Sequence, residues 1–171
     1  LFAKFTGVAL FLLLATLLLG GVAMLVILFV SNSYPPDRPV AWLTIVLALG
    51  LDACKCILLV SFAVLFSSIS TSFFLPVFGT IIIFLVGGAS QQAYDFVHSS
   101  AGSAVSPLVR HFASTLYYVL PNFSAFDLKV NAIYALTVNV QGIYLTIIYF
   151  FVYTAILLLC AVAIFNRREL G

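Results

Sequence analysis

The run FTGVALFLLLATLLLGGVAMLVILFV, from Phe5 to Val30, contains no charged residue and decides the class of this protein. A helix needs about 20 apolar residues to cross the hydrocarbon core of a bilayer, and this run exceeds that length. Across the chain, 64% of the residues are hydrophobic and 7% are charged, whereas a soluble domain carries roughly 25% charged residues. The chain is therefore expected to be an integral membrane protein.

Further apolar stretches continue this pattern, so the sequence predicts an all-α, polytopic membrane protein with a single transmembrane domain over residues 1–171. The proline-rich polar segment from Ser31 to Pro39 cannot continue a helix and is expected to form the first turn. The hydroxyl-rich segment from Ser67 to Ser72 is expected to form the next one. The predicted transmembrane helices lie at about 5–30, 41–66, 69–89 and 143–165.

Residues 90–141 differ from the rest because polar and charged side chains interrupt them. Pro107 and Pro121 divide this segment, and apolar residues recur at helical spacing between Leu108 and Leu120. This pattern predicts an amphipathic helix at the membrane surface, with one face in lipid. A second short helix is expected from Phe126 to Val138, directly before the last span.

Basic residues near the span ends predict the orientation of the protein. Lys4 opens the first span, while Arg167 and Arg168 close the fourth. An even number of spans puts both ends on one side, and an excess of lysine and arginine marks the cytoplasmic side. We therefore expect a multi-pass protein of the cell (inner or plasma) membrane with cytoplasmic termini, where these three residues are candidate cytoplasmic contacts. Residues 90–141 would then lie outside the cytoplasm.

Asp52 and Lys55 are the exception, because they lie in the middle of the second apolar run. Their spacing of three residues places them on one helix face, where they can pair. Each charge at mid-bilayer costs about 2.5–3.5 kcal/mol on insertion scales, which pairing reduces. The pair is a candidate intramembrane polar site: either part of a substrate pathway, ion site or proton relay, or a structural contact between helices or subunits.

Other chemistry finds little support in the sequence. Cys54 and Cys56 point to different faces of a helix, and Cys160 lies in another apolar run, so we interpret them as buried apolar residues. His98 and His111 lack the additional ligands of a metal site. No glycine loop that could cradle a phosphate is present, and a net charge of +2 does not favour nucleic acid. We expect no cofactor, no metal and no enzymatic activity.

Several segments together resemble type-2 ABC transporter permeases, in an order and spacing that cover nearly the whole chain. Leu1 to Gly7 is similar to the family's entry to a span, which carries a basic residue, an aromatic residue and a glycine. Lys55 to Ser68 is similar to a span that ends in a serine-rich turn. Leu116 to Leu128 resembles the segment before the final span, and Phe165 to Leu170 resembles the basic C-terminal ending of the family.

The resemblance implies the membrane subunit of an ABC-type exporter, energised by a separate cytoplasmic ATPase subunit and paired with a second permease copy or paralogue. It also implies that two further spans and a coupling segment precede Lys4. Residues 90–141 would match re-entrant or amphipathic extracytoplasmic helices. The Asp52 and Lys55 pair is not a motif that the resemblance carries over as a known site.

The alternative function is a non-catalytic accessory or structural subunit of a larger membrane complex. It is favoured by the lack of any catalytic constellation in the sequence. An intramembrane enzyme is disfavoured because no pair of catalytic groups converges within the spans.

Overall fold

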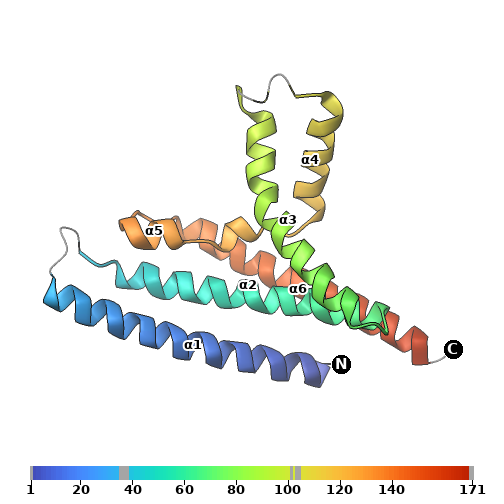
Figure 1. Cartoon of the computed structure of the whole chain (residues 1–171), viewed down its shortest axis with the longest axis horizontal. Coiled ribbons are helices and arrows are strands. Elements are labelled where there is room, and N and C mark those ends of the chain that lie inside the picture. The colour runs from blue at the N-terminus through green and yellow to red at the C-terminus, as the bar shows by residue number, and fades with distance from the viewer. Residues whose placement is uncertain (1, 35–38, 101, 103–104, 170–171) are drawn as a thin grey trace.

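The computed structural model describes residues 2–34, 39–100, 102 and 105–169, and the regular elements of these ranges are all helical (Figure 1). By length and composition, four of the helices could each cross a membrane, which indicates a multi-pass membrane protein. These four are α1 (Phe2–Ser33), α2 (Trp42–Ile69), α3 (Phe74–His98) and α6 (Val140–Glu169). The shorter elements are α4 (Pro107–Val119), the 3-10 helix η2 (Phe123–Phe126) and α5 (Lys129–Tyr134).

Helix α2 is the centre of the molecule, because it contacts α1, α3, α5, η2 and α6. In Figure 1, α1, α2 and α6 lie side by side, with the two chain ends at the same end of the bundle. The first half of α3 lies along α2, whereas its second half leaves the bundle and packs against α4 to form a helical hairpin. The chain returns to the bundle through η2 and α5 before α6 begins.

The buried core lies where α2, α6 and η2 meet. Its residues on α2 and α6 recur at intervals of seven or four positions, the spacing that keeps side chains on one helix face. Two phenylalanines of the short η2 helix complete the cluster, so η2 is anchored in the core of the bundle. The buried residues are Leu51, Leu58, Phe62, Phe123, Phe126, Phe150 and Leu157.

Helix α1 packs mainly on α2, and most of its apolar side chains are exposed. The two helices approach closely at Gly20, where an added Cβ would lie 2.8 Å from Leu49 Cδ1. Small residues allow such close packing between membrane helices. The exposed apolar face of α1 is therefore available to lipid or to another protein chain.

Several helix limits differ from those expected from the sequence. Helix α1 continues to Ser33, inside the segment expected to form the first turn, and α3 begins at Phe74 rather than at residue 69.

At two further ends that lie beyond the expected limits, polar side chains form hydrogen bonds within the helix. Helix α2 continues through Ile69, with the Ser68 hydroxyl donating to Leu65 O at 2.7 Å, so the turn begins only at Ser70. Helix α3 does not end near residue 89 but at His98. Its Gln91 side chain donates to Asp95 Oδ1 at 2.9 Å, one helical turn later.

The segment before α6 contains less helix than the sequence predicts. Helix α4 occupies the expected position, and Pro107 stands in its first turn, where a missing N–H costs nothing. The helix expected from Phe126 to Val138 is limited to α5, because Ala135 adopts the left-handed conformation with φ 51°. Helix α6 begins at Val140. The preceding residue, Asn139, accepts a hydrogen bond at its Oδ1 atom from the Gln141 backbone N–H at 3.0 Å. Of the expected proline-rich turn, residues 35–38 lie outside the described part.

Candidate functional site

The two charges in the middle of the apolar helix α2 form an ion pair, with Lys55 Nζ 2.6 Å from Asp52 Oδ1. The Lys55 side chain is 12% exposed and that of Asp52 is 43% exposed. The lysine is thus largely withdrawn into the protein, whereas the carboxylate keeps one side open. Such pairing is what a charged residue requires away from water.

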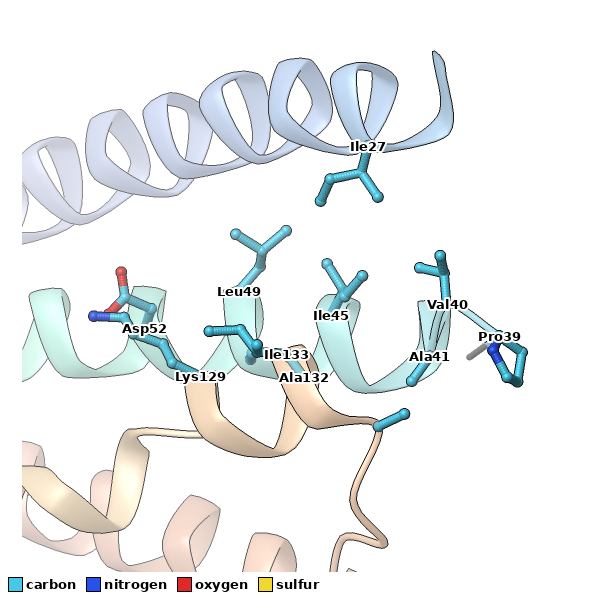
Figure 2. Close-up of a pocket in the computed structure, with 12 residues that line it drawn as sticks. Ile27, Pro39, Val40, Ala41, Ile45, Leu49, Asp52, Lys129, Ala132 and Ile133 are labelled. Atoms are coloured by element: carbon cyan, nitrogen blue, oxygen red, sulfur yellow. The ribbon is translucent and has the colours of Figure 1, made fainter. Parts of the chain in front are cut away.

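The open side of Asp52 faces a pocket of about 530 Å³ between α1, α2 and α5 (Figure 2). This volume lies within the roughly 300–1,000 Å³ typical of small-molecule sites. Two charged residues, Asp52 and Lys129, take part in a lining that is otherwise apolar. The lining residues are Ile27, Pro39, Val40, Ala41, Ile45, Ala48, Leu49, Asp52, Lys129, Ala132, Ile133 and Ala135.

The pocket is polar at one end and apolar over the rest of its length. Figure 2 shows Asp52 and Lys129 together at one end, with the Lys129 side chain directed toward Asp52, and Pro39 at the other. Within the described part of the chain, Lys129 forms no ion pair. The sequence indicates Asp52 as a candidate site residue but not Lys129, because only the packing of α5 on α2 brings them into one pocket.

A polar joint fixes the hairpin to the bundle. Asn122 Nδ2 donates to Gln91 Oε1 at 2.7 Å, and the Asn122 backbone N–H donates to Tyr149 Oη at 3.2 Å. The Ser124 hydroxyl donates to Gly88 O at 3.0 Å. These bonds tie the turn after α4 to both α3 and α6. The sequence contains the signal of an asparagine and a serine beside Pro121, but not the identity of their distant partners.

The same joint depends on a glycine. A Cβ added at Gly87 would lie 2.6 Å from Pro121 O and 2.7 Å from the Phe123 ring. Pro121 and Phe123 are both buried, so neither has room to withdraw. Gly87 therefore permits a close approach between α3 and the returning chain.

The candidate cytoplasmic residues lie at the opposite end of the bundle from the pocket. Lys4 lines a cavity of about 170 Å³ together with Val64, Ser67, Ser68 and Phe165, which come from the ends of α2 and α6. Ile27 lies 23 positions after Lys4 on α1, which at 1.5 Å per residue is roughly 35 Å along the axis.

Near that cavity, Arg167 is exposed in the last turns of α6. Arg168 follows it on the same helix, but its side chain lies outside the described part, together with those of Phe2 and Glu169.

The hairpin carries an aromatic cluster and a second cavity. The Tyr94 ring stacks on His98 and on Tyr117, with centroid distances of 4.2 and 4.4 Å. A second cavity of about 550 Å³ with almost wholly apolar walls lies between α3 and α4. His98 Nδ1 lies 2.9 Å from the Tyr94 carbonyl oxygen, so this histidine is engaged within its own helix. Within the described ranges, no three His, Cys, Asp or Glu side chains converge as metal ligands would.

Comparison with known proteins finds no matching family model, curated protein or solved structure.

Proposed function

We propose that this chain is the membrane-spanning permease subunit of an ABC-type exporter, energised by a separate ATPase chain. The observation that carries the proposal is the helical hairpin before the last apolar helix. In the permeases that the sequence resembles, re-entrant or amphipathic extracytoplasmic helices precede the final span. Here the second half of α3 and α4 form a hairpin in that place, and it returns to the bundle at Pro121.

The termini are proposed to face the cytoplasm and to contact the ATPase. Lys4 and the ends of α2 and α6 border one cavity, so a partner at this end would touch several helices at once. Lysine and arginine concentrate on the cytoplasmic side of membrane proteins. Lys4, Arg167 and Arg168 then become contacts through which ATP hydrolysis is coupled to helix movement.

A second permease copy or a paralogue is proposed to cover part of the exposed apolar surface of the bundle. Asp52 and Lys55 would act as a polar contact inside the bundle or at the dimer interface, since a charge pair within a membrane needs a protein or aqueous face. Replacing both with leucine tests this role. Unchanged assembly and unchanged ATP-driven transport would leave the pair without a special function.

The experiment for the main proposal is purification of the tagged full chain from its native membrane in a mild detergent. We expect an ATPase subunit with a phosphate-binding loop to co-purify, and the complex to hydrolyse ATP. Lys4→Glu should reduce recovery of that subunit, because it reverses a charge at the proposed contact. Arg110→Glu makes a charge reversal of the same size on α4 and should leave recovery unchanged.

Two outcomes would contradict the exporter proposal. One is stable isolation of the chain with an electron-transfer or pigment complex and no ATPase, which favours an accessory subunit. The other is recovery of the ATPase that is equally reduced by Lys4→Glu and Arg110→Glu, because contact at the cytoplasmic end predicts a difference.

A further inference from the structure

The pocket between α1, α2 and α5 carries a surplus positive charge. The Asp52 carboxylate is balanced by Lys55 at 2.6 Å, which leaves Lys129 as the remaining charge at that end of the pocket. Lys129 comes from α5, so the surplus depends on how α5 packs on α2. Lys129 is exposed, so its ammonium group is accessible to an anionic group of a ligand.

The rest of the pocket is an apolar trough. Ile27 of α1, Ile45 and Leu49 of α2, and Ile133 of α5 form its walls between the charged end and Pro39 (Figure 2). Its volume of about 530 Å³ suits an elongated apolar group. A ligand that satisfies both parts has a long apolar chain and an anionic head.

We propose that this pocket binds a single-chain amphiphile with an anionic head group, a long-chain carboxylate. The carboxylate would lie beside Lys129 and accept hydrogen bonds from its ammonium group. The open side of Asp52 would repel a second negative charge, so a singly charged head is favoured over a doubly charged one. The hydrocarbon chain would lie between α1 and α2, toward Pro39.

The proposed ligand would lie along α2, from the charged end of the pocket toward Pro39. Asp52 lies ten positions into this helix, whereas Pro39 precedes its start. The head group is therefore held deeper in the bundle than the tail. A diacyl lipid would have two chains to place in this trough, whereas a single-chain carboxylate has only one.

The test is photo-crosslinking of the purified full chain with a palmitate analogue that carries a diazirine on its chain. Crosslinked peptides are expected from α1, α2 and α5 at the pocket walls, and excess oleate should abolish them. Oleyl alcohol has the same chain without the charge and should compete at least about tenfold more weakly, as expected for loss of a charged hydrogen bond. Crosslinks confined to other surfaces would overturn the proposal.

Variants separate the charge from the shape of the pocket. Lys129→Gln should lower labelling about tenfold and Lys129→Arg should retain it, while Lys4→Gln removes the same charge elsewhere and should have no effect. Ala132→Phe fills the pocket and should block labelling, whereas Ala93→Phe fills the cavity of the hairpin and should not. Full labelling of Lys129→Gln would contradict the role of the charge.

Competition by phosphatidylglycerol as strong as that by oleate would contradict the single-chain assignment. The test uses no ATPase, so its result is independent of the exporter proposal.

Discussion

Replacing Gly87 with alanine is predicted to weaken the joint between α3 and the returning chain. The new Cβ would lie 2.6 Å from Pro121 O, whereas ordinary van der Waals contact begins at 3.4 Å, so the shortfall is 0.8 Å. Backbone and a buried ring form the obstacle, and both are held in the core. Relief therefore requires a shift of the whole turn after α4 rather than a change of one rotamer.

The magnitude follows from two opposing effects. Inserting a carbon into a packed interior costs about 1–3 kcal/mol. Alanine in place of glycine within a helix gains about 0.5–1 kcal/mol. The net expectation for Gly87→Ala is a loss of stability on the order of 1 kcal/mol.

The matched control is Gly88→Ala in the same helix, where an added Cβ meets nothing within 4 Å. It should gain the helix term without the steric cost and become about 0.5–1 kcal/mol more stable. The measurement is unfolding of the purified protein by increasing fractions of a denaturing detergent, followed by helical circular dichroism. Equal stability of the two variants would refute the packing argument, because the difference between them isolates the steric term.

Three further predictions concern polar groups and use the same unfolding measurement. Thr154→Val should raise stability by about 1 kcal/mol because the Thr154 hydroxyl is buried and has no hydrogen-bond partner among the described residues, whereas Thr146→Val removes a bonded hydroxyl on the same helix and should not; a loss of stability in Thr154→Val would contradict this reasoning. Asn122→Ala should lower stability by about 1 kcal/mol, since it removes hydrogen bonds of part-buried groups of the joint, and an unchanged midpoint would count against the joint. Asp52→Leu alone should cost on the order of 3 kcal/mol because it strands Lys55, while Asp52→Leu with Lys55→Leu should recover most of that loss; equal effects of the single and double variants would show that the pair is not coupled.

The helices of this protein could be predicted from the sequence because their signal is local. The uncharged run from Phe5 to Val30 falls inside α1, and the stretch from 143 to 165 falls inside α6. The predicted ends of α2 and α3 were less accurate than the predicted positions of the helices, for a physical reason. The hydroxyl of Ser68 and the side chain of Gln91 look like turn or loop signals, yet both form hydrogen bonds within their own helices.

The joint and the pocket could not be predicted, because they depend on contacts between distant residues. The close approach of Gly87 to Pro121 is set by the path of the hairpin. Lys129 is an ordinary polar residue of a connecting segment until α5 folds onto α2. Periodicity predicts which face of a helix is apolar, but not which helix covers it.

The described contacts divide the molecule into a tightly packed part and a loosely packed part. The meeting of α2, α6 and η2 holds the buried aromatic core, whereas α5 buries none of its residues and α1 buries only Gly20 in its described part. Few buried contacts mean a low free-energy cost for local movement. The pocket lies where α1 and α5 border α2, so an amphiphile bound there would bury surface of all three at once. Ligand binding is therefore expected to restrain the elements that move most easily and to leave the hairpin joint unchanged.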